Sequence, residues 1–261
     1  MDEMGISAAT YLVCPSKMLI FDLFCVIILS MKRLTLLIDA DDTVLDFKNS
    51  ERDAIIELCE QFCIDDGEAV ADKFKQINRR MWDMFELGLI TREEIFYTRF
   101  EELFAFYGIE DKNIVEVGDA YRENMARSRR IIKGARAFLR RASADHDLYC
   151  VTNGVTRTQK MRMKSSGLGK YFKKLYISQE MNLAKPSKEF FKCVLADIGV
   201  VDLQDVYIIG DSLTSDVQGG INSGIKTILY NAENKQIKDI RPDYEVKNYR
   251  QLEKLIFELS K

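Results

Sequence analysis

Residues 34–43 read Leu34-Thr35-Leu36-Leu37-Ile38-Asp39-Ala40-Asp41-Asp42-Thr43. A continuous apolar run of this length is typical of a strand that is buried on both faces of a parallel sheet. Such a strand does not need three carboxylates at its end, and neighbouring carboxylates raise each other's pKa unless a cation or a basic group lies among them. The stretch therefore predicts a central strand that ends in a charged site.

Four further apolar runs follow along the chain, at residues 148–151, 175–177, 206–209 and 227–229. Apolar residues at helical spacing indicate helices between and after these runs, at about 133–141, 187–198, 214–222 and 248–260. Short buried strands that alternate with helices are the pattern of an α/β domain with a parallel sheet. We therefore expect an α/β fold.

Residues 48–130 differ from the rest because they contain no convincing strand. They read as four helices, at about 49–64, 68–86, 91–107 and 112–127, separated in part by Gly88 and Gly108. An insertion directly after the first strand would lie over the strand ends, where ligands bind in α/β folds. We therefore expect a core of residues 31–47 and 131–261 with a helical domain at 48–130.

Polar residues follow each of the later strands near the sheet's expected carboxyl edge. The stretches are Thr152-Asn153-Gly154, Lys185-Pro186 and Gly210-Asp211-Ser212, with Asp216 close by. Because the carboxyl ends of parallel strands converge on one edge, these side chains are expected to meet Asp39 and Asp41. Several carboxylates and one lysine make a plausible site for a hard, oxygen-seeking cation such as Mg²⁺.

The sequence lacks the patterns that define other known binding sites rich in aspartate or glycine, so these sites are excluded. An EF-hand loop starting at Asp39 would need glycine at its sixth position and glutamate at its twelfth, which here are Val44 and Ser50. The chain has neither the G-x-G-x-x-G pattern of dinucleotide sites nor the G-x-x-x-x-G-K-[ST] pattern of P-loops. Each polar stretch that follows a predicted strand is weak evidence alone, so the interpretation depends on the order of these stretches at successive strand ends.

The composition excludes further classes of protein. Of the 261 residues, 47% are hydrophobic and only 3 are proline, which argues against a disordered chain. A net charge of −3 argues against a broad nucleic-acid surface. The single histidine, His146, excludes a multi-histidine metal centre, and we expect it to have a surface or structural role. The six cysteines form no C-x-x-C pair, and their low density fits a cytoplasmic protein.

Residues 18–31 form an apolar segment near the start of the chain that is shorter than a membrane span and includes Asp22. No small-residue cleavage site follows it. We expect residues 1–30 to lie outside the functional domain, as after a misplaced start codon. A membrane-tethering segment and an ordinary packed element stay open as alternatives.

The ordered motifs resemble those of the haloacid dehalogenase (HAD) superfamily, and the resemblance covers residues 34 to about 230. It implies a Rossmann-like parallel sheet core with an inserted α-helical cap of the C1 type. The acidic Asp42, where many members have glycine, and cap stretches such as Asn78-Arg79-Arg80-Met81-Trp82 and Arg99-Phe100 resemble the bacterial pyrimidine 5′-nucleotidase-like subgroup. The four matching motifs are Asp39-Ala40-Asp41-Asp42-Thr43, Thr152, Lys185, and Gly210-Asp211 with Asp216.

The resemblance implies a role for each motif residue. Asp39 would be the nucleophile that forms an aspartyl-phosphate, and Asp41 the general acid and base. Thr152, Asn153 and Lys185 would bind the phosphoryl group. Mg²⁺ would be held by Asp39, the backbone carbonyl of Asp41, Asp211 and Asp216, the last directly or through water.

The implied enzyme is a Mg²⁺-dependent phosphatase for a small phosphate monoester, most simply a pyrimidine or noncanonical nucleoside 5′-monophosphate. A sugar-phosphate phosphatase, a phosphomutase, a 2-haloacid dehalogenase and a non-catalytic interaction module stay open. A nucleic-acid polymer is not an expected partner, and the oligomeric state is open. The cap would choose the substrate, with candidate contacts from Trp82, Phe85, Phe96, Tyr97 and Arg99.

Overall fold

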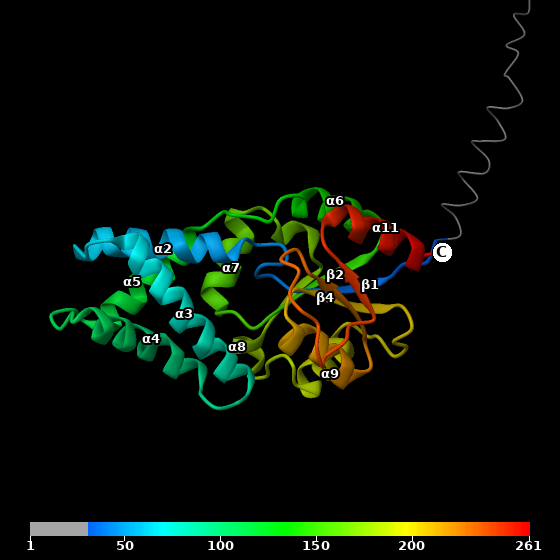
Figure 1. Ribbon diagram of the computed structural model, residues 1–261. Helices are drawn as coiled ribbons and strands as arrows, with labels where there is room; N and C mark the ends of the chain where they lie inside the picture. The colour runs from blue at the N-terminus through cyan, green and yellow to red at the C-terminus, as the bar shows by residue number, and fades with distance from the viewer. Residues whose placement is uncertain (1–30) are drawn as a thin grey trace, which may run out of the picture.

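The computed structural model describes residues 31–261, so the interpretations of segment 1–30 lie outside the described residues. Figure 1 shows a sheet with helices on both faces and a separate group of helices beside its carboxyl edge. No helix of residues 31–261 is long and apolar enough to cross a membrane.

Six parallel strands form one sheet in the order β3-β2-β1-β4-β5-β6. Their bounds are β1 (Thr35–Ile38), β2 (Asp147–Thr152), β3 (Lys174–Ile177), β4 (Val206–Gly210), β5 (Lys226–Tyr230) and β6 (Tyr244–Val246). The five predicted strands are present. The sixth was not predicted, because β6 has three residues and only Val246 is buried.

Strand β1 lies at the centre of the sheet and sets the position of the site. Thr35 pairs with Asp147 of β2 on one side and with Val206 of β4 on the other. The strand order therefore reverses direction at β1, because β2 lies on one side of it and β4 on the other. In open α/β sheets, a ligand-binding crevice lies outside the carboxyl ends of the strands where the strand order reverses. Asp39 is the first residue after β1 and lies at this crevice.

Both faces of the sheet are covered, which explains the continuous apolar runs. Leu36 and Ile38 pack into one core with α6 (Ala135–Asp145) and α11 (Tyr249–Leu259). Leu37 points to the opposite face, because alternate residues of a strand face opposite ways, and packs with α9 (Lys188–Asp197). Figure 1 shows α6 and α11 above the sheet and α9 below it.

Four helices between β1 and α6 form a third apolar core of their own, which we call the helical layer. They are α2 (Phe47–Phe62), α3 (Gly67–Glu86), α4 (Arg92–Tyr107) and α5 (Ile114–Arg127), each within two residues of its predicted ends. Thr91 and Glu94 form a capping box at the start of α4. This core includes Phe74, Phe100 and Tyr121, whose ring centroids lie 5.1–5.6 Å apart.

The remaining short elements were only partly predicted. The segment predicted as a helix at 214–222 consists of a π-helical turn, η2 (Leu213–Val217), followed by α10 (Gln218–Ser223). Helices α7 (Thr156–Ser165) and α8 (Ser178–Met181) and the 3₁₀ turn η1 (Gly169–Tyr171) were not predicted.

His146 has the structural role that was expected, but it is buried rather than exposed. It ends α6, and its Nδ1 accepts a hydrogen bond from the backbone N–H of Leu34 at 3.4 Å. Burial lowers the pKa of His146. The residue therefore ties α6 to the start of β1 and lies away from the carboxyl edge of the sheet.

Candidate active site

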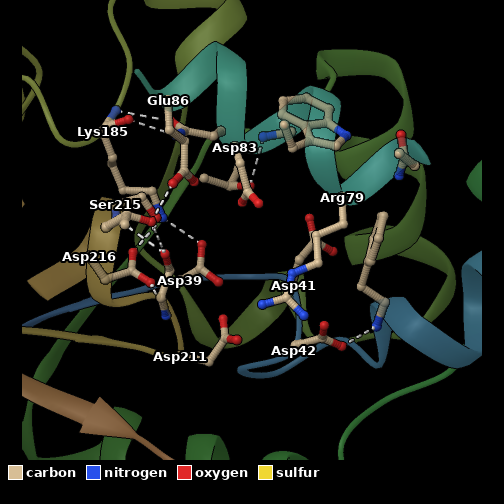
Figure 2. A pocket seen from close by; sticks show the side chains of 18 of the residues that line it. Asp39, Asp41, Asp42, Arg79, Asp83, Glu86, Lys185, Asp211, Ser215 and Asp216 are labelled. Atoms are coloured by element: carbon tan, nitrogen blue, oxygen red, sulfur yellow. Dashed lines mark hydrogen bonds and ion pairs between the residues drawn. The ribbon is translucent and has the colours of Figure 1, made fainter. Parts of the chain in front are cut away.

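Lys185 lies at the centre of a buried charge cluster at the carboxyl edge of the sheet. Its Nζ donates to Asp39 Oδ1 at 2.6 Å, to Asp216 Oδ1 at 2.7 Å and to the Val151 carbonyl at 3.1 Å. These three bonds use all three hydrogens of the ammonium group. The side chain of Lys185 is 2% exposed and that of Asp39 is 9% exposed. Figure 2 shows Lys185, Asp39 and Asp216 pointing toward one another.

Asp216 reaches this cluster because the chain turns closely after β4. Gly210 ends the strand, and a Cβ atom at this position would lie 2.1 Å from Asp216 Oδ2. The same Oδ2 accepts from the backbone N–H of Ser212 at 3.1 Å. Asp216 lies in the π-helical turn η2, a rare conformation that occurs often at functional sites. The glycine of the Gly210-Asp211 motif is therefore needed for the close approach of a carboxylate.

Three carboxylates are arranged so that they could hold one cation. Oxygen atoms of Asp39, Asp211 and Asp216 lie within 4.8 Å of one another. Carboxylate oxygens are the donors that Mg²⁺ prefers, so this donor set fits the predicted ion. Asp211 also accepts from Lys235 Nζ, at 2.6 Å to Oδ2 and 2.9 Å to its backbone carbonyl.

Asp41 is held apart from these carboxylates by two residues of α7. Arg162 Nη1 donates to Asp41 Oδ1, and Gln159 Nε2 donates to Oδ2 at 2.8 Å. Arg162 and Gln159 are each 1% exposed. Their i, i+3 spacing places both on one face of the helix. Each oxygen of Asp41 thus has its own donor. The predicted contact of its backbone carbonyl with Mg²⁺ stays a prediction.

Thr152 and Asn153 occupy different positions in the site. Thr152 Oγ1 accepts from the Gly154 N–H at 3.1 Å and from Gln159 Nε2 at 2.9 Å, so its own hydrogen is free to donate into the cavity that it lines. The side chain of Asn153 bonds the backbone of Lys185 twice, at 2.8 and 2.9 Å. Asn153 therefore positions the loop that carries Lys185, and its predicted contact with phosphate stays a prediction.

Asp42 is the position at which the sequence departs from the glycine that the resemblance led us to expect. Its φ is +54°, in the left-handed region that aspartate tolerates better than most residues, as expected. Its Oδ1 accepts from the backbone N–H groups of Phe47 and Lys48 at 3.1 and 3.2 Å, at the start of α2. Asp42 therefore connects the turn after β1 to the first helix of the helical layer. Burial raises the pKa of Asp42 to about 6.

The site holds more negative than positive groups. Burial raises the pKa of Asp39 well above its usual range. Lys185 lowers this pKa, and Asp216 raises it. Burial also raises the pKa of Asp211. Burial alone would lower the pKa of Lys185, but Asp216 and Asp39 raise it above its usual value, so Lys185 stays charged. Further positive charge at these carboxylates would favour their ionised forms.

A family model for haloacid dehalogenase-like hydrolases matches residues 34–224. The chain belongs to the haloacid dehalogenase-like hydrolases. It is therefore an enzyme of a hydrolase family, as the order of the motifs predicted. The family covers β1 to α10, which includes every residue of the predicted site.

Three bacterial proteins are similar to this hydrolase over most of their length. HAD-hydrolase YfnB of Bacillus subtilis is 38% identical over 85% of this chain and 95% of its own. The pyrimidine 5′-nucleotidases PynA of Streptococcus pneumoniae and YjjG of Escherichia coli are 35% and 30% identical, over 92% and 95% of their lengths and 83% and 84% of this chain. The magnesium-bound crystal structure of YfnB superposes with a TM-score of 0.81 over 86% of this chain and 99% of its own, which confirms the predicted α/β fold.

One cavity of about 940 Å³ joins the carboxylate site of this hydrolase to the helical layer. One face of α3 contributes Lys75, Asn78, Arg79, Trp82, Asp83 and Glu86 to its wall. Figure 2 shows Arg79 pointing from α3 into the cavity, toward the side that holds Asp41 and Asp42. Among the five candidate substrate contacts, Trp82, Phe96 and Arg99 line the cavity, whereas Phe85 and Tyr97 do not.

Hydrogen bonds of Glu86 and Arg92 are among those that join the helical layer to the sheet domain beside the cavity. Thr214 donates to Glu86 Oε2 at 2.5 Å. The Nη2 of Arg92 donates to Ser178 Oγ at 2.6 Å and to the Asn153 carbonyl at 3.4 Å. Arg92 is buried and lies over the ring of Phe85, 4.9 Å from its centroid.

Gln159, Arg162 and Lys235 contact site residues but were not predicted from the sequence. Helix α7 was missed because its sequence, TRTQKMRMKS, has four basic residues and too few apolar ones for a helical pattern. A polar pair at i, i+3 spacing shortly after Thr152-Asn153-Gly154 is the signal that was available. Lys235 lies in a loop and has no sequence signal of this kind.

Proposed function

We propose that this enzyme hydrolyses phosphate monoesters with Asp39 as nucleophile and Mg²⁺ as cofactor, and that its substrates are nucleoside 5′-monophosphates, chiefly those of pyrimidines. The observation that carries the proposal is the contrast between two carboxylates two residues apart. Asp39 lies among other carboxylates and accepts a hydrogen bond from Lys185, whereas Asp41 accepts hydrogen bonds from Arg162 and Gln159. Different surroundings suit two carboxylates to different roles. The names of PynA and YjjG support the substrate class.

In the first step, Asp39 attacks phosphorus. Its Oδ1 is bonded to Lys185, so Oδ2 is the oxygen free to react. A bond forms between Oδ2 and phosphorus, the bond from phosphorus to the ester oxygen breaks, and a proton on Asp41 passes to the leaving alkoxide. Arg162 and Gln159 hold Asp41 in place for this transfer.

In the second step, water hydrolyses the aspartyl-phosphate. Asp41, now a carboxylate, takes a proton from water as the water oxygen bonds to phosphorus. The bond between phosphorus and Asp39 Oδ2 breaks, inorganic phosphate is released, and Asp41 is protonated again. One carboxylate therefore serves as acid and then as base.

Lys185 and the free hydrogen of the Thr152 hydroxyl stabilise negative charge on the phosphoryl oxygens. Asp39, Asp211, Asp216 and the backbone carbonyl of Asp41 would hold Mg²⁺. When bound, this ion neutralises charge on the phosphoryl group and on the surrounding carboxylates. A crystal structure of YfnB is bound to magnesium, which supports this choice of ion.

We also propose that the helical layer is a cap that chooses the substrate and excludes water. It supplies one wall of the cavity and meets the sheet domain through Arg92 and Glu86. The crystal structure of YfnB reveals interdomain movement, and an equivalent movement here would admit substrate. A location in the cytoplasm stays a prediction from the low cysteine content.

Phosphate release by the full chain would test the proposal. The substrates are UMP, CMP, GMP, ribose 5-phosphate and 2-chloropropionate, the last assayed for chloride, each with Mg²⁺ and with EDTA. We expect release from the pyrimidine nucleotides that needs Mg²⁺, returns when Mg²⁺ is restored after EDTA, and is lost in Asp39→Asn.

Other outcomes would separate the alternatives. Release chiefly from ribose 5-phosphate would keep the mechanism but replace the substrate class. Chloride release without metal would indicate a dehalogenase. No product from any substrate by folded protein would contradict the proposed activity.

A further inference from the structure

A second buried polar cluster lies in the helical layer and lines the same cavity as the carboxylate site. Asn78 Nδ2 donates to Glu51 Oε1 at 2.5 Å, and Arg99 Nη1 donates to Asn78 Oδ1 at 2.9 Å. The three residues come from α2, α3 and α4 and are 2–4% exposed, yet each contributes to the cavity wall. The proposed chemistry uses none of them.

The side-chain amide of Asn78 is fixed in one orientation. A guanidinium donates only, so Arg99 must face the carbonyl oxygen of this amide. The NH₂ group of Asn78 then faces Glu51. One N–H and one oxygen lone pair of the amide remain for another partner.

Arg99 also keeps an unused donor. Its Nε has no hydrogen-bond partner among residues 31–261, although the side chain is buried. Its guanidinium is surrounded by aromatic rings, with the centroid of Tyr121 at 4.6 Å, that of Phe100 at 5.2 Å and that of Phe74 at 5.5 Å. A buried donor without a partner is costly, and a bound ligand that accepts from it would remove that cost.

The free groups of the cluster match the edge of a pyrimidine. Two donors, from Asn78 and Arg99, stand beside an acceptor on Asn78 or Glu51. Uracil and cytosine each present two acceptors and one donor along their hydrogen-bonding edge, whereas guanine presents one acceptor and two donors. We propose that Asn78 and Arg99 read the hydrogen-bonding edge of a pyrimidine base, an inference that rests on the proposed nucleotidase activity.

Aromatic side chains beside the cluster suit the faces of such a base. Trp82 follows Asn78 by one helical turn on α3, so both lie on the same face of that helix, and Phe96 of α4 also lines the cavity. Both rings are only partly buried. A planar base can therefore stack on an aromatic ring while its edge meets Asn78.

The test compares substrates that differ only at the base. We would measure kcat/KM for UMP, N3-methyl-UMP and ribose 5-phosphate with the wild type, Asn78→Ala, Arg99→Lys and Asn124→Ala. N3-methyl-UMP lacks the edge donor, and ribose 5-phosphate lacks the base. Asn124 is the matched control, because it is a buried amide of the same helical layer, bonded to the Ala54 carbonyl, that does not line the cavity.

We expect Asn78→Ala to lower kcat/KM for UMP by roughly 10- to 100-fold, and by at least tenfold more than for ribose 5-phosphate. Arg99→Lys should act in the same direction. The wild type should hydrolyse N3-methyl-UMP at least about tenfold more slowly than UMP, a comparison that needs no variant to fold. Asn124→Ala should leave the ratio of UMP to ribose 5-phosphate as in the wild type.

Two results would overturn the inference. One is an equal loss for UMP and ribose 5-phosphate in Asn78→Ala, and the other is equal hydrolysis of UMP and N3-methyl-UMP by the wild type. If UMP hydrolysis still depends on Asp39 in those cases, the nucleotidase proposal stands and only the base-reading role fails. If the wild type prefers ribose 5-phosphate to UMP, both proposals fail.

Discussion

Two buried polar clusters line one cavity, and they are built in different ways. The cluster around Lys185 joins side chains that follow β1, β3 and β4 at the edge of the sheet. The cluster around Asn78 joins side chains from the facing sides of three helices. The first is made of full charges, and the second connects one acid and one base through a neutral amide.

This difference matches two tasks. Stabilising charge that develops on a phosphoryl group requires charged groups that are fixed before the reaction. Reading a neutral base requires donors and acceptors that are fixed in direction, because a wrong base then leaves buried groups unpaired. If the tasks are separate, variants of the first cluster should affect all substrates alike, and variants of the second should depend on the base.

The largest effect is expected for Lys185→Met. Loss of the ammonium removes the charge beside Asp39, and kcat should fall by about 10³-fold or more for UMP and ribose 5-phosphate alike. Two buried acids would also lose their partner, which should lower the free energy of unfolding by about 3 kcal/mol or more. Steady-state phosphate release and urea unfolding would measure both effects.

Lys188→Met is the control for this change, because Lys188 is exposed at the start of α9. It should behave like the wild type in both measurements. If Lys185→Met lost activity toward UMP alone, the proposed division of tasks between the clusters would be wrong. If the variant kept a tenth or more of wild-type activity, the proposed role of Lys185 in catalysis would be contradicted.

A smaller effect is expected for Arg162→Lys, because lysine cannot reproduce the planar guanidinium at Asp41. We expect kcat to fall by about 100-fold, with KM within a few-fold of the wild type and no dependence on the base. Arg157→Lys, on an exposed residue of the same helix, should leave kcat as in the wild type. A rise in KM alone would instead place Arg162 in substrate binding.

The contrast between the clusters also explains what could be predicted from the sequence. Asp39, Asp211 and Lys185 follow strands, and a charge has no structural reason to follow a buried strand, so their order was informative. Glu51 lies on a helix face where polar residues are common, so nothing marked it. Asn78 was noted only within a stretch that resembles the nucleotidase-like subgroup, with no role of its own. Gln159 and Arg162 were hidden because α7 lacks an apolar face that would have revealed it as a helix.

The second cluster should be visible in the pH dependence of stability. Burial raises the pKa of Glu51 to about 7 from its usual 4.5. The folded protein therefore binds a proton at Glu51 more tightly than the unfolded chain does between these values. The contribution of Glu51 to the free energy of unfolding is fully present below about pH 4.5. This contribution, on the order of 3 kcal/mol, is lost as the pH rises to about 7.

Glu51→Gln removes this titration, so urea unfolding at pH 5 and pH 8 should differ less in the variant than in the wild type. Other buried acids, such as Asp42, titrate in the same direction in both proteins, so the difference between the two isolates Glu51. Glu60→Gln, on an exposed residue of α2, should keep the wild-type dependence. An unchanged slope in Glu51→Gln would mean that Glu51 is ionised in the folded protein across this range.

The smallest effect is expected where the helical layer contacts the residues beside the Lys185 loop. Arg92 starts α4 in the helical layer and donates to Ser178 and to the carbonyl of Asn153, whose side chain holds the Lys185 loop. Arg92→Ala should loosen this contact, lower kcat/KM by about 3- to 10-fold for every substrate, and speed hydrogen exchange at residues 152–156. Arg80→Ala is the control, since Arg80 is exposed and pairs with Glu102 inside the helical layer. A loss in Arg92→Ala that falls on UMP alone would assign Arg92 to base reading rather than to the contact between the helical layer and the residues beside the Lys185 loop.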